Sequence, residues 1–97
     1  MNYRNKKILK AAQGEDCTMH SPMCNGDRAT VVAAHSNLQC HGKGRGLKSH
    51  DCFVAFLCSG CHSWYDQGPA TKSDKESYFW PAFSRTLLRL LQTGVLK

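Results

Sequence analysis

The 97-residue sequence has no long apolar run, no internal repeat and only seven acidic residues. No stretch is long and apolar enough to span a bilayer as a helix, so we expect no membrane partner. The first ten residues lack both the apolar core and the small-residue cleavage site of a secretory signal peptide. We therefore expect a cytoplasmic protein, whose thiols stay reduced and favour metal binding over disulfide formation.

The absence of linkers and repeats predicts one domain that covers residues 1–97. A domain of this size buries a limited fraction of its surface on folding, so a bound metal or a cross-link adds needed stability. The six cysteines of the chain can supply such a site.

Acidic residues are outnumbered by thirteen Lys and Arg, which gives a formal net charge of +6. The basic residues gather near the N-terminus, in a glycine-rich segment and near the C-terminus: Arg4, Lys6, Lys7, Lys10, Lys43, Arg45, Lys48, Lys72, Lys75, Arg85 and Arg89. This distribution favours a polyanionic partner, with nucleic acid as the first candidate. Charge alone is equally consistent with a role in solubility, so the functional interpretation depends on a site beside it.

Apolar periodicity and turn residues predict a small α+β domain. The expected elements are a helix over about 3–13, strands over 30–34 and 52–57, a short helix over about 59–67 and a long helix over 74–93. The two strands are expected to pair antiparallel, with His35 at the end of the first strand. The glycine-rich segment between them, residues 36–50, is expected to form a flexible basic loop.

The long C-terminal helix carries three local signals. Ser73 and Glu76 form a capping-box pattern that places the N-cap at Ser73. Pro81 lacks an amide hydrogen and clashes with the preceding turn, so a kink or a break is expected near residues 77–81. Helical spacing predicts a core face made of these residues: Trp80, Phe83, Leu87, Leu90 and Leu91.

A dense group of metal-ligand residue types begins at Cys58, where Cys-Ser-Gly-Cys-His is followed closely by Asp66. A Cys-x-x-Cys-His sequence can be half of a structural zinc site, a redox dithiol or the attachment signal for a c-type haem. The redox interpretation lacks a βαβ context, and the haem interpretation lacks an export signal. Structural zinc is therefore the leading interpretation.

Cys17 and Cys24 form a second pair that can join Cys58 and Cys61 in a tetrahedral thiolate site for Zn²⁺. Thirty-three residues lie between the two pairs, enough for two strands to go out and return to the same end of a hairpin. The haem interpretation leaves the first pair without a role.

Two cysteines and three histidines are not assigned to a site. Cys52 is expected to point into the core as a small hydrophobic residue. Cys40 is an alternative zinc ligand if one member of the first pair is not a ligand. His20, His41 and His50 are expected to be solvent-facing or loop residues.

His62 and Asp66 are four residues apart, so on a helix they share one face. Such a pair can hold a divalent ion with open coordination positions. If the strand pair packs against this helix, His35 faces the pair across a gap. His62 and Asp66 would then hold a metal ion, and His35 would transfer a proton.

These features resemble the HNH endonucleases, whose ββα-metal fold has two strands, a helix and a histidine that ends the first strand. More closely, they resemble the small nucleases encoded by lambdoid phages and prophages. The segments that carry this likeness are Ala34-His35-Ser36-Asn37, the basic Gly-rich loop, His50-Asp51, residues 57–62 and Asp66-Gln67. The likeness covers nearly the whole chain, with the zinc knuckle and ββα core over about 15–68.

The resemblance implies hydrolysis of DNA phosphodiester bonds with one divalent metal ion, such as Mg²⁺, Mn²⁺ or Ni²⁺, in the cytoplasm of a bacterial host. His35 matches the general base of the family. His62 and Asp66 match its metal ligands. The basic loop, with Lys43, Arg45 and Lys48, would hold phosphates, and the candidate DNA substrates include branched or recombination intermediates.

Two positions depart from the family pattern. Many HNH enzymes have a metal-ligating Asp or His immediately before the base, where this chain has Ala34. The middle Asn of the HNH motif has no clear counterpart, and Asp51 or Asn37 can take its place. The missing ligand supports an alternative function, a zinc-stabilised nucleic-acid-binding module without catalytic activity.

Overall fold

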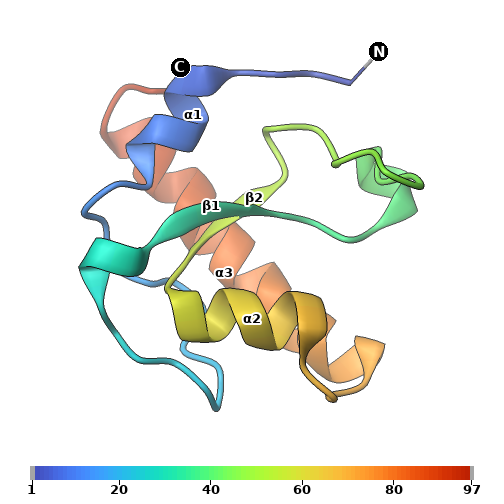
Figure 1. The fold of residues 1–97 in the computed structure, drawn as a ribbon. Helices are drawn as coiled ribbons and strands as arrows, with labels where there is room; N and C mark the ends of the chain where they lie inside the picture. The colour runs from blue at the N-terminus through green and yellow to red at the C-terminus, as the bar shows by residue number, and fades with distance from the viewer. Residues whose placement is uncertain (1, 97) are drawn as a thin grey trace.

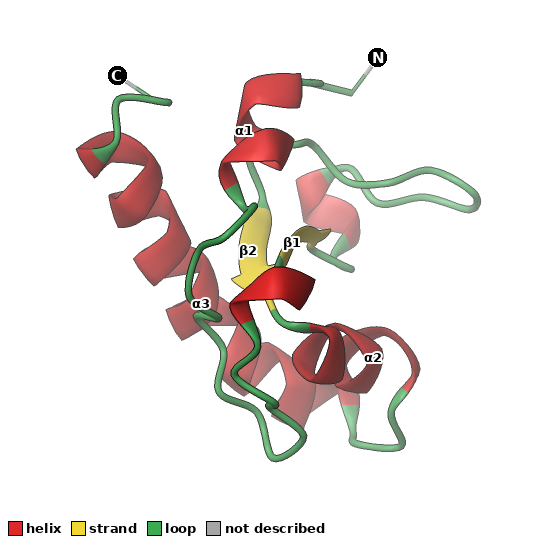
Figure 2. Cartoon of the chain, turned by 60° about the vertical axis from the view of Figure 1, so that its left-hand side comes forward, coloured by secondary structure: helices red, strands yellow, loops and turns green. Residues whose placement is uncertain are grey.

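The computed structural model describes residues 2–96, which form a small compact α+β domain (Figures 1 and 2). Its elements are α1 (Lys6–Ala11), β1 (Val32–His35), β2 (Val54–Leu57), α2 (Ser59–Gln67) and α3 (Lys72–Gln92), with 3-10 turns over Arg28–Thr30 and Gln39–His41. None of the helices within the described residues is long and apolar enough to cross a membrane.

The two strands pair antiparallel, with Val32 opposite Leu57 and His35 opposite Val54, as predicted. Each strand is shorter than predicted. Thr30 belongs to a 3-10 turn, so the first strand begins at Val32, and the second strand begins at Val54 rather than Cys52. All four residues of β2 are buried. In Figure 1, α1 lies above the two strands and α2 below them, while α3 passes behind the strands and packs against β2. The sheet thus carries His35 at the end of one strand and leads directly into α2 from the other.

The outer edge of β2 is completed by two threonines rather than by a third strand. The backbone N–H of Phe56 donates to Thr86 Oγ1 at 3.0 Å. The carbonyl of Phe56 accepts from the backbone N–H of Thr18 at 2.8 Å and from its hydroxyl at 2.9 Å. Thr86 is fully buried, so its hydroxyl satisfies a strand N–H that no water can reach. Hydrogen bonds as well as packing therefore hold α3 and the segment around Thr18 against β2.

The start of α3 differs from the prediction. Thr71, rather than Ser73, is the N-cap, and its side chain accepts from the backbone N–H of Asp74 at 3.1 Å. The helix then continues from Lys72 to Gln92 with Pro81 inside it, so the predicted break does not occur. A bend at Pro81 stays a prediction. Glu76 reaches the hydroxyl of Tyr65 at 3.2 Å instead of closing a capping box.

The buried face of α3 also differs from the predicted apolar stripe. Its buried residues are Phe79, Ala82, Thr86 and Leu90. Trp80 and Leu91 are 43% and 48% exposed, so their assignment to the core was wrong. Two contacts fix this orientation: Phe79 stacks on Tyr65 of α2 with ring centroids 4.8 Å apart, and Thr86 bonds to β2. The apolar pattern of the sequence did not reveal this face, because two of its buried residues, Ala82 and Thr86, contribute little to that pattern.

Replacing Thr86 with valine should destabilise the domain while keeping its volume. The substitution leaves the buried N–H of Phe56 without an acceptor, which costs about 1 to 3 kcal/mol of unfolding free energy. Urea denaturation followed by circular dichroism measures the loss. Thr86→Ser is the control, because it keeps the hydroxyl and removes only a methyl group. Equal stability of Thr86→Val and the unmodified protein would contradict this role of the hydroxyl.

Candidate metal centre and active site

Four cysteines converge at the junction between β2 and α2. The sulfur atoms of Cys17, Cys24, Cys58 and Cys61 all lie within 4.8 Å of one another. The Sγ–Sγ distances are 3.6 Å for Cys17–Cys61, 3.8 Å for Cys17–Cys24 and 3.7 Å for Cys24–Cys58. A tetrahedron with Zn–S bonds of about 2.3 Å has edges of about 3.8 Å. The four thiols therefore have the spacing and the chemistry to hold a metal such as zinc.

Local structure places each sulfur atom of this cluster. Cys58 follows β2 and is the N-cap of α2, and Cys61 lies in the first turn of that helix. A side chain at Gly60 would meet the carbonyl oxygen of Met23, with a Cβ only 2.1 Å away, so glycine lets the loop of Cys24 approach the helix. Ser21 donates to Cys61 Sγ from its hydroxyl at 3.2 Å and from its backbone at 3.4 Å.

The environment of Cys58 favours a thiolate. Burial alone would raise its pKa, but backbone N–H groups of Cys61, Asn25 and Gly26 point at the sulfur and lower the pKa to about 6. Metals bind the deprotonated sulfur, so this thiol is prepared for coordination. Cys40 is exposed and Cys52 is half-buried, and neither belongs to the cluster.

A second group of polar side chains surrounds His35 at the end of β1. His35 Nε2 lies 2.8 Å from Asp51 Oδ1, and Asp51 is almost completely buried. Burial would raise the pKa of Asp51, but the hydrogen bonds from His35 and from the backbone of Asn5, together with the charge of Arg4, lower it overall. An ionised carboxylate only accepts hydrogen bonds. Nε2 of His35 therefore carries the hydrogen in this bond, and in the neutral imidazole Nδ1 is the nitrogen with the lone pair.

His62 and Asp66 lie one helical turn apart on α2, as their spacing predicted. His62 Nε2 is 3.0 Å from Asp66 Oδ2, and the two side chains are 40% and 41% exposed. The hydrogen bond to Asp66 raises the pKa of His62, against the effect of burial. Burial would raise the pKa of Asp66, but the hydrogen bond and charge of His62 lower it overall. Asn37 Nδ2 donates to Asp66 Oδ1 at 3.4 Å.

One cavity of about 440 Å³ brings these groups together. Its lining includes His35 at the end of β1, Asn37 just after it, His62 and Asp66 of α2, and the loop residues Lys43 and Lys48. Arg45 is exposed and does not line it. Asp51 lies behind His35, outside the lining. A candidate base, a candidate ligand pair and two cations thus share a single concave surface.

The basic loop is held more firmly than predicted. His41 is buried, its ring stacks on Phe53 with centroids 4.0 Å apart, and its Nδ1 lies 2.7 Å from Ser36 Oγ. His41 is therefore a loop residue, as one of the two expectations for it had it, but it does not face solvent, and burial lowers its pKa. His20 is exposed as expected, while His50 is half-buried and accepts from the backbone N–H of Tyr3 at 2.8 Å.

Sequence reasoning missed the contribution of the N-terminal segment to this site. Arg4 and Asn5 both contact Asp51, which lies 47 and 46 residues further along the chain. No periodicity or motif links positions so far apart. The prediction of a covering helix at the N-terminus gave no indication of these contacts.

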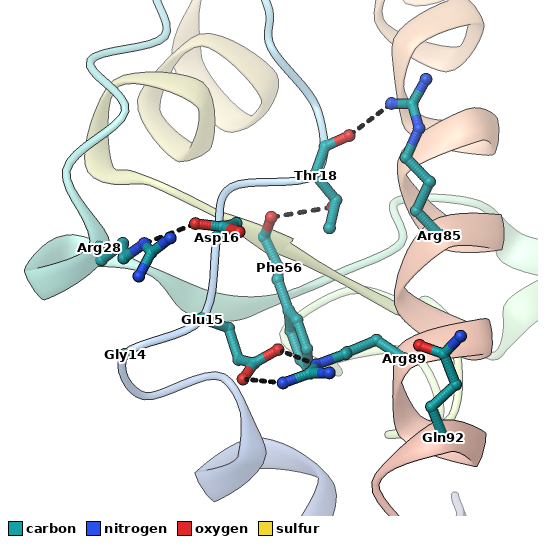
Figure 3. Close-up of a pocket in the computed structure, with 9 residues that line it drawn as sticks. All are labelled: Gly14, Glu15, Asp16, Thr18, Arg28, Phe56, Arg85, Arg89 and Gln92. Atoms are coloured by element: carbon teal, nitrogen blue, oxygen red, sulfur yellow. Dashed lines mark hydrogen bonds and ion pairs between the residues drawn. The ribbon is translucent and has the colours of Figure 1, made fainter.

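A second cavity of about 440 Å³ lies between the segment 14–18 and α3 (Figure 3). Arg28 pairs with Asp16, Arg89 with Glu15, and Arg85 donates to the backbone carbonyl of Thr18. No histidine or cysteine lines it. These contacts hold the segment around Cys17 in place. Because the guanidinium groups already have partners, the cavity offers no set of reactive groups.

Comparison with known proteins agrees with a nuclease. The family model described as "Putative nuclease YbcO" matches residues 6–95. A solved structure described as that of a putative bacteriophage protein from Escherichia coli str. K-12 substr. MG1655 is similar, with 28% sequence identity and a TM-score of 0.71. The match covers 90% of this chain and 99% of that chain. No curated protein matches the sequence.

The purified protein should contain one zinc ion per chain, and Cys61→Ser should lose both the zinc and the fold. Structural zinc contributes about 10 to 16 kcal/mol of apparent binding free energy, which exceeds the stability of most small domains. Elemental analysis and circular dichroism measure the two effects. Cys40→Ser should change neither, because Cys40 is exposed and lies outside the cluster. Iron with a visible Soret band would instead support the haem interpretation.

Proposed function

The chain belongs to the family described as Putative nuclease YbcO, and from this we propose that it is a metal-dependent DNA endonuclease of the HNH type. The observation that carries the proposal is the single cavity lined by His35, His62, Asp66 and two lysines. The two antiparallel strands followed by a helix, next to a four-thiol cluster, agree with the ββα-metal arrangement. The similar structure is described as that of a putative bacteriophage protein, which supports a phage-type nuclease.

His35 is the proposed general base. It lines the cavity, and its hydrogen bond to Asp51 leaves Nδ1 free to take a proton from water. The water oxygen then attacks phosphorus while the bond to the leaving 3′ oxygen breaks. The ionised Asp51 stabilises the imidazolium that forms, and it keeps the ring from rotating. Positioned bases of this kind contribute about 10²- to 10⁴-fold to the rate.

His62 and Asp66 are the proposed ligands of a divalent ion. Their side chains offer one imidazole nitrogen and one carboxylate oxygen, 3.0 Å apart and open to solvent. Metal binding would replace the proton that they share. When bound, the ion supplies positive charge that polarises the phosphate and stabilises the leaving oxygen. Ala34 is buried and provides no ligand, so water and phosphate oxygens would complete the coordination.

The basic loop is the proposed DNA-binding element. Of the twelve Lys and Arg within residues 2–96, only Arg4, Arg28 and Arg89 form ion pairs with acidic side chains. Lys43 and Lys48 line the cavity without such a partner. Their charges are available for phosphate groups, which position the DNA without reading its sequence.

Replacing His35 with alanine should abolish cleavage while leaving DNA binding intact. Nicking of supercoiled plasmid with Mg²⁺, Mn²⁺ or Ni²⁺ should fall by about 10²- to 10⁴-fold. His20→Ala is the matched control, because His20 is exposed and does not line the cavity. The second candidate function is a zinc-stabilised DNA-binding module, which the missing ligand at Ala34 favours. Binding without nicking under all three metals, unchanged by His35→Ala, would support the module over the enzyme.

Lys43→Gln and Lys48→Gln should each weaken DNA binding and lower its salt dependence. Each lost phosphate contact reduces the slope of log Kd against log salt concentration by about 0.9. Fluorescence anisotropy at several salt concentrations measures the slope. Lys7→Gln removes the same charge from an exposed position that does not line the cavity, so its effect should be smaller. Equal effects of all three substitutions would indicate diffuse electrostatic attraction rather than a defined contact.

A further inference from the structure

We infer that Arg4 is a positioning residue for His35, because it holds Asp51 in the orientation that accepts the Nε2 hydrogen of that histidine. The inference rests on the proposed function, since His35 needs a fixed orientation only if it acts as the base. It assigns a role in the active site to a residue in the N-terminal segment before α1. Arg4 does not line the cavity but contacts Asp51 directly, so the proposed effect on His35 passes through Asp51.

Three donors fix the two oxygens of Asp51. Oδ1 lies 2.8 Å from His35 Nε2 and 3.2 Å from Arg4 Nη1. Oδ2 accepts from the backbone N–H of Asn5 at 2.7 Å. The backbone N–H of Asp51 in turn donates to the carbonyl of Tyr3 at 3.0 Å. The carboxylate plane is therefore set by the N-terminal segment, and the plane sets the direction of the hydrogen bond to His35.

The charge of Asp51 requires a cation that stays protonated. The carboxylate side chain is only 3% exposed, and a buried charge without a partner is costly. His35 can serve as counter-ion only by holding a second proton, and it is then unable to act as a base. Arg4 is charged at all working pH values. It therefore gives Asp51 a counter-charge that does not depend on the protonation of His35.

Other charged groups lie near His35 but do not replace Arg4. Lys43 and Lys48 of the loop and His62 and Asp66 of α2 line the same cavity, on the open side of the imidazole. None of them forms an ion pair with Asp51 within residues 2–96. Arg4 approaches the carboxylate from behind, together with Asn5.

Arg4 also supports the basic loop, and this second role needs a control. Its Nη2 donates to the carbonyl of Lys48 at 2.8 Å, and its Nη1 donates to the carbonyl of Ser49. Asn2 supports the same loop, because its side chain donates to the carbonyls of Gly42 at 2.8 Å and Lys48 at 2.9 Å. Asn2 makes no hydrogen bond to Asp51. Asn2→Ala therefore removes support from the loop alone.

The kinetic test compares Arg4→Gln, Arg4→Lys and Asn2→Ala on plasmid DNA, with zinc content and thermal unfolding measured for each. Arg4→Gln should lower kcat by about 10- to 100-fold, and its Kd for DNA should change no more than that of Asn2→Ala, which also loses loop contacts. Arg4→Lys should recover part of kcat because it keeps the charge. Asn2→Ala, which weakens the loop but leaves the partners of Asp51 in place, should lower kcat much less than Arg4→Gln does. An equal fall in kcat for Asn2→Ala, or a fall that only follows loss of zinc or unfolding, would overturn the inference.

A spectroscopic test does not depend on cleavage. With ¹⁵N-labelled histidine, the NMR signals of His35 should show the Nε2–H tautomer in the original protein and a changed tautomer or protonation in Arg4→Gln. If the His35 signals change in Arg4→Gln while the original protein cuts no DNA, the result would support the positioning role and count against the proposed nuclease. Unchanged His35 signals in Arg4→Gln would overturn the inference whatever the effect on kcat.

Discussion

The convergence of four thiols at the start of α2 is the constraint on which the rest of the structure depends. The segment from Cys17 to Cys24 has no regular secondary structure of its own, and the cluster joins it to the end of β2. Because Cys58 caps α2 and Cys61 lies in its first turn, the same cluster fixes where the helix begins relative to the sheet. His62 follows the last thiol directly, so its distance from the strand carrying His35 is set by where the thiol cluster fixes the start of α2.

The helix α2 packs into the core on one side and lines the cavity on the other. Tyr65 packs against Phe79 of α3, and its hydroxyl accepts from the backbone N–H of Asn37 at 3.0 Å and reaches Glu76. That hydrogen bond ties the chain just after His35 to the helix that carries Asp66. His62, Asp66 and His35 are thus carried by rigid elements, which keeps the groups of the proposed active site at fixed distances from one another.

The two polar pairs of the site differ in a way that suits their proposed roles. His62 and Asp66 are open to solvent, so an ion and a phosphate can reach them. His35 and Asp51 are largely enclosed, with the carboxylate oxygens occupied by Arg4 and the backbone of Asn5. Enclosure strengthens the hydrogen bond that selects the tautomer. A metal-ligand pair must be accessible to the ion, whereas a general base must keep a fixed orientation.

The sequence alone determined what depends on local spacing. The cysteine pairs, the strand ending at His35 and the placement of His62 and Asp66 on one helical face follow from patterns within a few residues. The tertiary structure decided the rest. The burial of His41 and Thr86, the exposure of Trp80 and the contact of Arg4 with Asp51 each depend on segments far apart in the chain. Such contacts produce no periodic pattern in the sequence. Whether a polar side chain is buried depends on its hydrogen-bond partner and not on its neighbours in sequence.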